Sequence, residues 1–369
     1  MTPKMLIPIL AILAACQGGE KTEKTETPVP KATFNDTLYG KPTHLYELHN
    51  GKLSAKITDY GARLVSLTVP DRKGNNVAVV IGFDSVQGYV ENKGSYFGAI
   101  IGRYGNRIGK GTFKLKNTTY QIPVNNGPNA LHGGKRGFDD YVWDAFKEND
   151  STLDLYLLSP DGDMGFPGNL KVKVTYALTH QGIKIEYTAN TDKPTVLNLT
   201  NHAYWNLNGE DSGTILDHVL QIDAVSYTPV DTGLIPFGIL MPVSGTPLDF
   251  IKPMPIGARI NADNIQLKNG KGYDHNFVLG DGKPSDTLKH AATVWGDKSG
   301  IIMDVWTMEP GLQFYSGNFM KGAHAYRSAL CLETQHFPDS PNKPAWPSTE
   351  LDPGKTYHTV TEYRFTTQP

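Results

Sequence analysis

The sequence predicts an all-β protein built as one large antiparallel sandwich, and three observations lead to that prediction. Short stretches of alternating apolar residues recur from about residue 36 onward, as expected of half-buried strands. The 38 glycines and 25 prolines among 369 residues suit a chain with many tight connections. No stretch shows several turns of apolar residues at the 3.6-residue spacing of an amphipathic helix. A sandwich closed enough to cover its edges accommodates all three.

The expected strands follow from alternation and from the turns between them. Asn and Gly within 71–76 supply one turn, and His180-Gln181-Gly182 and residues 297–300 supply two others. The last run is rich in aromatic and β-branched residues, which strands favour. The expected strands are 52–58, 63–69, 77–81, the hairpin 171–178 with 183–189, the hairpin 293–295 with 301–306, and 357–365.

Composition excludes several classes of protein. The chain has 35 Lys and Arg against 37 Asp and Glu, so it lacks the basic footprint of a nucleic-acid binder. Aromatic residues make up 10% of the chain, which argues against wholesale disorder. Of the two cysteines, Cys16 lies in an apparent export signal, which leaves Cys331 as the single thiol of the mature body.

Residues 1–15 are predicted to be the signal peptide of a lipoprotein. Lys4 precedes an apolar run at 5–15, which is shorter than the roughly 20 residues of a membrane-spanning helix. The run ends Leu13-Ala14-Ala15-Cys16, which resembles a bacterial lipobox whose cysteine receives the lipid before cleavage. An ordinary secretory signal with an incidental cysteine is the alternative.

Residues 16–35 are expected to form the lipidated cysteine and a disordered tether, because 17–33 contain one branched aliphatic residue and no aromatic. Residue 17 is Gln rather than Asp, which by resemblance to Gram-negative sorting suggests the outer membrane. We therefore expect an exported lipoprotein, held to that membrane only by its N-terminal lipid and facing the periplasm or the cell surface. Residues 36–369 would form a single domain, as a monomer or weak dimer.

Five clusters of polar residues interrupt the segments that are predicted to form strands. They are GRYGNRI at 102–108, NALHGG at 129–134, VLNLTNHAYWN at 196–206, GYDHNF at 272–277 and ALCLETQHFPD at 329–339. Glu333 breaks an apolar strand, which is unfavourable unless its carboxylate is paired or functional. Each cluster also has a structural interpretation: a lone histidine in the core, Asp274 as a turn former, and Glu333 on a solvent-facing edge.

The sequence lacks the motifs of several classes of catalytic site. There is no HExxH or CxxC, so no catalytic metal is expected. There is no GxSxG nucleophile turn and no GxxxxGK[ST] phosphate loop. Glu333 and Asp274 are a conceivable carboxylate pair for glycoside hydrolysis, but the histidine in each cluster makes that pairing weaker.

From about residue 38 to the C-terminus these clusters resemble, in order, the motifs of the aldose 1-epimerase (galactose mutarotase) family. Further matching motifs are YFGA at 96–99, RGFD at 136–139, SPDGDMGFPG at 159–168 and PGLQFYSGN at 310–318. The resemblance implies a β-supersandwich fold and interconversion of the α and β anomers of free aldohexoses such as glucose and galactose. It implies no cofactor and a monosaccharide as the binding partner.

Carried over motif by motif, the resemblance assigns Glu333 as general base and His202 as general acid. It implies sugar contacts at Asn106, Arg107, His132, Tyr204, Asp274 and Gln313. The base would take the C1 hydroxyl proton while the acid protonates ring oxygen O5, and closure would reverse both transfers. His202 would have to be held protonated against an ordinary pKa of about 6.5, a task for which a carboxylate such as Asp274 is the candidate. Tyr204 and Phe314 are expected either to face the sugar ring or to pack in the core.

Two alternatives remain at this point. A relative acting on hexose phosphates would need Arg or Lys side chains aimed at the phosphate. A non-catalytic sugar-binding lipoprotein would need no acid–base pair, so the presence of both Glu333 and His202 speaks against it. A role in equilibrating anomers released by extracellular glycan breakdown is the physiological hypothesis.

Overall fold

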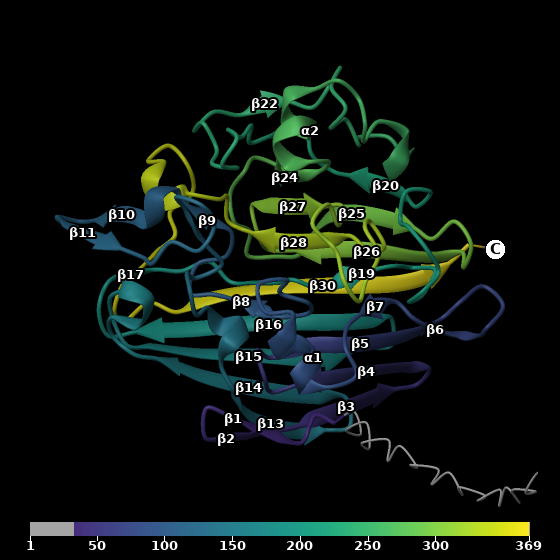
Figure 1. Ribbon diagram of the computed structural model, residues 1–369, viewed down its shortest axis with the longest axis horizontal. Coiled ribbons are helices and arrows are strands. Elements are labelled where there is room, and N and C mark those ends of the chain that lie inside the picture. The colour runs from purple at the N-terminus through teal and green to yellow at the C-terminus, as the bar shows by residue number, and fades with distance from the viewer. Residues whose placement is uncertain (1–32, 369) are drawn as a thin grey trace, which may run out of the picture. The chain divides into compact units, whose positions relative to one another are not determined.

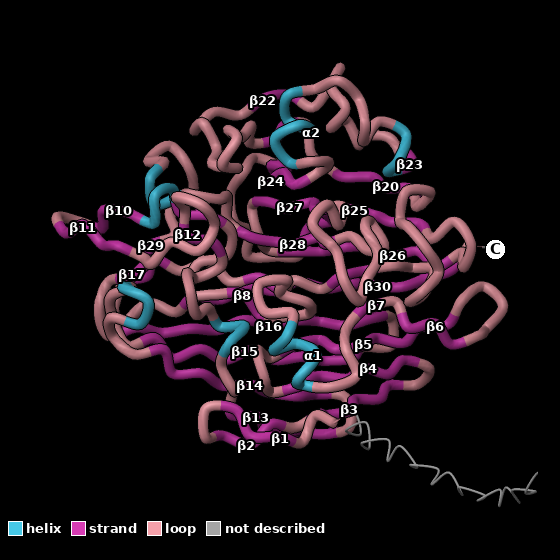
Figure 2. The backbone as a smooth tube through the Cα atoms, in the orientation of Figure 1, coloured by secondary structure: helices cyan, strands magenta, loops and turns pink. Residues whose placement is uncertain are grey.

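The structure is a computed structural model that describes residues 33–368. Every ladder between its named strands is antiparallel, which confirms the all-β prediction (Figure 1). The α-helices of this part are short, α1 (Val86–Glu91) and α2 (Ile265–Gly270), and most of the remaining chain is loop (Figure 2). Single 3-10 turns lie at Gly109–Gly111, Phe138–Asp140, Asp163–Gly165, Ile256–Ala258 and Ser340–Asn342.

A nine-stranded sheet forms the frame of the fold. Its order is β13 (Asp144–Asn149), β14 (Thr152–Ser159), β15 (Leu170–Leu178), β16 (Gly182–Thr191), β30 (Tyr357–Thr367), β26 (Ile301–Thr307), β25 (Lys289–Trp295), β20 (Val219–Ile222) and β23 (Met254–Pro255). The two predicted hairpins are β15–β16 and β25–β26, and the last strand, β30, lies between them.

Two smaller sheets and six strand pairs complete the body. The five-stranded sheet has the order β22 (Met241–Pro242), β21 (Ser226–Tyr227), β24 (Asp274–Val278), β27 (Gly311–Tyr315) and β28 (Cys331–Gln335). The four-stranded sheet has the order β3 (Leu45–Asn50), β4 (Leu53–Thr58), β5 (Arg63–Pro70) and β6 (Asn76–Ala78). The pairs are β1 (Asp36–Leu38) with β2 (Lys41–Thr43), β10 (Thr112–Leu115) with β11 (Thr118–Gln121), β12 (Ala130–Leu131) with β9 (Arg107–Ile108), β17 (Thr195–Val196) with β29 (Glu350–Leu351), β18 (Thr200–Asn201) with β8 (Ile100–Ile101), and β19 (Tyr204–Trp205) with β7 (Val80–Ile81).

One face of the nine-stranded sheet is buried along its middle strands. Ile183, Tyr363 and Val305 lie directly opposite one another in register, and all three are buried. The four-stranded sheet, through residues such as Leu48 and Ile57, and the five-stranded sheet belong to the same core cluster. The core is therefore a sandwich with the long sheet on one side and the smaller sheets on the other, as the register and burial require.

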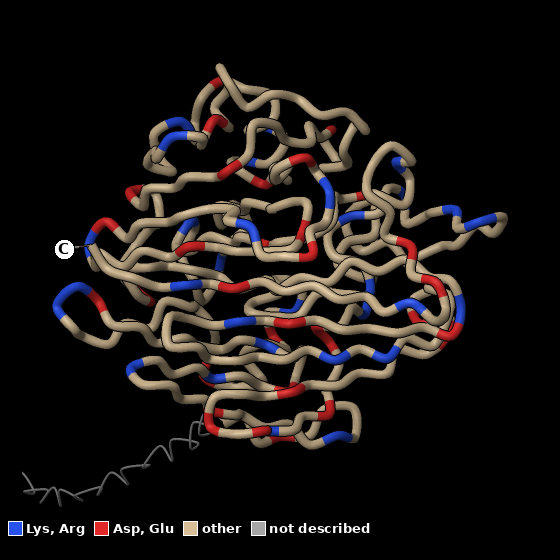
Figure 3. The backbone as a smooth tube through the Cα atoms, turned by 180° about the vertical axis from the view of Figure 1, so that it is seen from behind, with Lys and Arg blue, Asp and Glu red and all other residues tan. Residues whose placement is uncertain are grey.

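The expected strand at 77–81 is broken in the structure. Val79 separates β6, which pairs with β5, from β7, which pairs with β19. The chain changes sheets at this point, and alternation within one segment does not reveal a change of partner. The charged residues of the described chain mix both signs along the strands, in keeping with the near-zero net charge (Figure 3).

The predicted signal peptide, Cys16 and the tether up to residue 32 lie outside the described residues. The folded body begins before residue 36, because Phe34 is buried and its ring centroid lies 6.3 Å from that of Tyr89. Residues 33–368 contain no helix with the length and apolarity of a membrane span.

Candidate active site

The five-stranded sheet has one polar and one apolar face. Gln313 on β27 lies directly opposite Asn276 on β24 and opposite Glu333 on β28. Because side chains alternate along a strand, these three share one face, whereas Leu332 and Phe314 point into the core on the other. The apolar interruption at Glu333 is thus explained, since this carboxylate is buried but belongs to a polar face rather than to the core.

Short strand pairs carry the loops that cover this polar face. Arg107 pairs with Leu131 across β9 and β12, which sets Asn106 beside His132. The backbone N–H of Asn106 donates to His132 Nδ1 at 3.1 Å, and the His132 N–H donates to the Asn106 carbonyl at 3.0 Å. His202 follows β18 and is held in the same way, because its N–H donates to the Ala99 carbonyl at 2.9 Å.

The LHGG motif has a steric basis. Gly133 has a φ of +91°, and a Cβ there would lie 2.1 Å from the carbonyl oxygen of Gly102. Only glycine allows the loop to lie this close to the neighbouring backbone. The loop therefore fixes the position of His132 above the sheet.

The predicted site residues converge on one cavity of about 860 Å³. Seven of the eight line it: Asn106, Arg107, His132, His202, Tyr204, Asp274 and Glu333. Gln313 lies beside them, and its amide nitrogen donates to Asp274 Oδ1 at 2.7 Å. Its Oε1 has no hydrogen-bond partner among residues 33–368, and the sugar contact at Gln313 stays a prediction.

Glu333 and His202 form a loose buried pair. His202 Nε2 lies 3.7 Å from Glu333 Oε1, and among residues 33–368 the other carboxylate oxygen, Oε2, has no hydrogen-bond partner. Burial raises the pKa of Glu333 well above its ordinary value, with a further contribution from the charge of Asp274. Burial also lowers the pKa of His202 to about 4.

Burial disfavours the charged form of both groups, so the ionised pair that ring opening needs depends on the attraction between the Glu333 carboxylate and the His202 imidazolium. A carboxylate with a raised pKa is a stronger base, and an imidazolium with a lowered pKa is a stronger acid. The expectation that Asp274 keeps His202 protonated is not met, since Asp274 bonds to Gln313 and lies 3.8 Å from the Arg107 guanidinium. The carboxylate that faces His202 is Glu333 itself.

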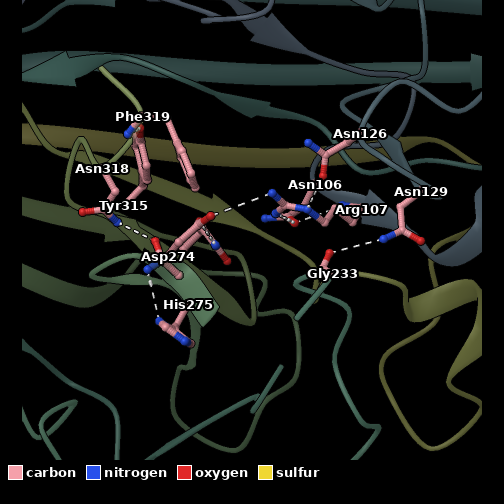
Figure 4. A network of polar contacts seen from close by, with 12 residues as sticks. Asn106, Arg107, Asn126, Asn129, Gly233, Asp274, His275, Tyr315, Asn318 and Phe319 are labelled. Atoms are coloured by element: carbon pink, nitrogen blue, oxygen red, sulfur yellow. Dashed lines mark hydrogen bonds and ion pairs between the residues drawn. The ribbon is translucent and has the colours of Figure 1, made fainter. Parts of the chain in front are cut away.

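Arg107 and Asp274 face each other across the cavity (Figure 4). Arg107 Nε donates to Asn126 Oδ1 at 3.1 Å, which fixes the plane of the guanidinium. Burial raises the pKa of Asp274, while Arg107 and Gln313 act in the opposite direction. Together they offer one fixed donor and one fixed acceptor for sugar hydroxyls.

Aromatic side chains form the rest of the wall. The Tyr204 ring stacks on Phe97 at 4.1 Å and its hydroxyl donates to the Ser95 carbonyl, so the ring rather than the hydroxyl is available to a ligand. Phe314 lies in the core, which confirms the packing alternative for that residue. Its neighbour Tyr315 faces the cavity, as does Tyr96, and neither was predicted. Strand alternation from Gln313 would have indicated Tyr315.

The donor set of His132, His202 and Glu333 has ligand atoms within 4.8 Å of one another. A metal would require a lone pair on His132 Nε2. Because His132 Nδ1 accepts from the Asn106 backbone and burial lowers the pKa of the ring, the neutral imidazole carries its proton on Nε2. That nitrogen is therefore a hydrogen-bond donor, as contact with a sugar oxygen requires.

Comparisons with known proteins agree with this geometry. The sequence profile of the family described as aldose 1-epimerase matches residues 44–364. The galactose mutarotase of Mus musculus is 41% identical over 346 residues, which cover 91% of this chain and 98% of that protein. The aldose 1-epimerase of Escherichia coli K12 is 41% identical over 340 residues, covering 88% of this chain and 96% of that protein.

Solved structures agree as well. The aldose epimerase homologue from C. elegans has a TM-score of 0.81 at 30% identity, covering 89% of this chain and all of that one. Galactose 1-epimerase from Lactobacillus acidophilus has a TM-score of 0.79 at 28% identity, covering 90% of this chain and 97% of that one. The match of the family profile over residues 44–364 and the two relatives at 41% identity show that this chain belongs to the aldose 1-epimerase family.

Proposed function

We propose that this protein interconverts the α and β anomers of free aldohexoses such as glucose and galactose, with Glu333 as base and His202 as acid. One observation carries the proposal: a buried carboxylate with an unpaired oxygen lies 3.7 Å from an imidazole nitrogen, and both line the cavity. The names of the relatives, galactose mutarotase and aldose 1-epimerase, support the substrate class.

The reaction opens the sugar ring. Glu333 takes the proton of the C1 hydroxyl, the C1–O5 electron pair moves to O5, and His202 Nε2 donates a proton to O5. Rotation about C1–C2 presents the other face of the aldehyde. Closure then returns the O5 proton to His202 and the Glu333 proton to the C1 oxygen, so both groups end as they began. No proton is gained or lost.

The neighbouring side chains support this pair. The Nε2–H of His132 and the guanidinium of Arg107 are positioned donors for charge that develops on the sugar oxygens. Asp274 accepts hydrogen bonds from hydroxyls away from C1, and the rings of Tyr204 and Tyr315 lie against the apolar face of the sugar. The sugar is thereby held with its C1–O5 edge toward Glu333 and His202.

The proposal includes export and anchoring through lipid on Cys16, leaving the catalytic domain at the outer membrane. The support is the sequence of residues 1–16. Mass spectrometry of the membrane-extracted protein tests this proposal. A diacylglyceryl adduct that is lost in Cys16→Ala is expected, whereas a soluble protein cleaved elsewhere would contradict it.

Polarimetry tests the catalytic proposal. Freshly dissolved α-D-glucose and α-D-galactose are followed with residues 33–369 of the wild type, with Glu333→Gln, and with Glu47→Gln as a surface control. Wild type and control should relax fast, and Glu333→Gln should be slower by about 10²–10⁴-fold. Relaxation at the spontaneous rate with folded wild type would contradict the proposal and favour a binding protein.

A further inference from the structure

A buried thiol lies directly behind His202. Cys331 is fully buried at the first position of β28, and its Sγ is 3.5 Å from His202 Nδ1. Cys331 lies two residues before Glu333, so both project from the same face of the strand. Within residues 33–368, no other side chain hydrogen-bonds to Nδ1, and the other hydrogen bond to the ring comes from the backbone of His202 itself, which raises the pKa of the ring. The two nitrogens of His202 thus face different groups, Nδ1 the thiol and Nε2 the carboxylate.

We propose that Cys331 is a positioning residue for His202, whose thiol sulfur accepts a hydrogen bond from Nδ1–H so that Nε2 is the nitrogen that exchanges a proton with the sugar. This inference rests on the proposed roles of Glu333 and His202. It assigns a role to Cys331, the one cysteine among residues 33–368.

The proton transfers of the cycle require a hydrogen-bond acceptor for the Nδ1–H of His202. During ring opening the imidazolium loses its Nε2 proton to O5 and becomes the neutral ring that still carries Nδ1–H. During closure Nε2 regains that proton. Nδ1 is therefore protonated throughout the cycle, and its N–H needs a partner because the ring is buried. Without one, the neutral ring can adopt the other tautomer, in which Nε2 cannot take the proton back.

The chemical nature of the acceptor matters. A carboxylate at this position would add negative charge, favour the imidazolium and weaken the acid. The thiol of Cys331 stays neutral, because burial raises its pKa. Around the ring lie His132, Tyr96, Tyr204 and Tyr315, and these are neutral when His132 is unprotonated. Glu333 is the charged group in contact with the ring, and the charge of Arg63 lowers the pKa of His202 from farther away. A neutral sulfur thus orients the ring while leaving the protonated form acidic.

Three substitutions separate this role from simple packing. Cys331→Ala removes the acceptor, Cys331→Ser retains one, and Cys331→Asp supplies a charged one. Thr334→Val is the matched control, because Thr334 is buried on the opposite face of the same strand and bonds to Thr361 instead. Thermal unfolding verifies that each variant is folded before its kcat, KM and pH profile are measured by polarimetry.

The expected results are specific. Cys331→Ala should lower kcat about 10-fold or more with KM changed less than about 3-fold, in the range seen when groups that orient a functional histidine are removed. Cys331→Ser should restore kcat to within about 3-fold of wild type. Cys331→Asp should move the pH profile set by His202 to higher pH. Thr334→Val should change thermal stability without changing kcat.

The tautomer supplies a second readout that does not depend on turnover. Nitrogen-15 NMR of the histidines should show His202 protonated at Nδ1 in wild type and in Cys331→Ser, and a mixture of tautomers in Cys331→Ala. Wild-type kcat in Cys331→Ala, equal losses in Ala and Ser, or a neutral His202 protonated only at Nε2 in wild type would each overturn the inference. If wild type itself fails to accelerate mutarotation, the proposed function fails, while the NMR arm still tests the thiol contact.

Discussion

Residues 33–368 contain two buried Glu–His pairs that differ in how many hydrogen-bond partners their carboxylates have. In one, His336 Nδ1 lies 2.7 Å from Glu309 Oε2, and the Tyr357 hydroxyl donates to Oε1 at 3.4 Å. In the other, His202 Nε2 lies 3.7 Å from Glu333 Oε1, and Oε2 has no partner among the described residues. His336 stands only three residues after Glu333 in the chain.

The tight pair contributes to stability, whereas the loose pair leaves a carboxylate oxygen open to a ligand. A buried carboxylate that is hydrogen-bonded on both oxygens offsets its desolvation, and removing its partner is strongly destabilising. A buried carboxylate with a free oxygen is less stable but can accept a proton from a ligand. The tight pair, His336 with Glu309, therefore holds the chain in place directly after β28. The loose pair, His202 with Glu333, lines the cavity.

The largest expected effect is on the loose pair. His202→Asn should lower kcat by about 10²–10⁴-fold in polarimetry, because it removes the proton donor to O5. Adding Glu333→Gln should cost much less than the product of the single effects, since acid and base act as a unit. Independent, multiplicative losses would show that the two side chains do not share one proton-transfer sequence. Circular dichroism is the control for folding.

The next effect concerns orientation of the sugar. Asp274→Asn should lower kcat/KM by about 10–100-fold, mainly through KM, because one charged acceptor is lost while the bond from Gln313 can persist. Initial rates over a range of galactose concentrations separate the two constants. A loss confined to kcat would instead place Asp274 among the proton-transfer groups.

A smaller effect is expected in the pH dependence. The form that opens the ring carries one proton on the pair, so the profile of kcat/KM against pH should be bell-shaped. Its alkaline limb should have a midpoint above 4.5, because that limb reports loss of the proton from the pair and burial raises the pKa of Glu333. Asp274 contributes to that rise, so Asp274→Asn should move the midpoint to lower pH. A midpoint at the ordinary glutamate value in wild type, or no movement in the variant, would contradict the assignment of the base.

The same raised pKa has a consequence for stability. The folded state holds the Glu333 proton more tightly than the unfolded state, so this group contributes stability below its unfolded pKa that is lost as the pH rises through its folded pKa. The unfolding free energy of the wild type should therefore fall with pH in the range where Glu333 ionises, and Glu333→Gln should abolish this contribution to the slope. Denaturant unfolding at several pH values measures it, and an unchanged slope would argue against the raised pKa.

The smallest effect is expected at the edge of the tight pair. Tyr357→Phe removes two long hydrogen bonds, one donated to Glu309 and one accepted from the Leu199 N–H, and should lower the unfolding free energy by about 1–3 kcal/mol. Mutarotation rates should stay within about 2-fold of wild type. A large loss of activity would show that the tight pair is coupled to the cavity.

The sequence predicted the long strands well and the short ones poorly. Hairpin β15–β16 can be predicted because both strands and their turn lie in one continuous segment, Leu170–Thr191. The two-residue strands that carry the site cannot be predicted in this way. Arg107 pairs with Leu131 and Ile101 pairs with Thr200, and no local sequence pattern encodes these contacts. Single segments likewise did not determine which face Glu333 occupies. The register of β27 with β28 determines it.

The site residues were predicted through motifs rather than geometry, and the errors follow from that. Gln313 lies on the polar face opposite Glu333 and donates to Asp274, a contact that no motif indicated. Cys331 and Tyr315 were overlooked as site residues, although each lies two positions from a predicted one on the same strand. Cys331 and Tyr315 were missed because their distance from the cavity depends on how side chains pack across neighbouring strands.

The most direct test makes the same chemical change in each pair. Glu333→Gln and Glu309→Gln are compared by polarimetry and by thermal unfolding at pH 8. We expect Glu333→Gln to lose turnover by about 10²–10⁴-fold and to unfold at or above the wild-type temperature. Glu309→Gln should retain turnover within about 3-fold and lose about 1.5–3 kcal/mol of stability, as expected for a hydrogen bond to a charged group. Equal losses of turnover in the two variants, or a destabilised Glu333→Gln beside an unchanged Glu309→Gln, would contradict these expectations.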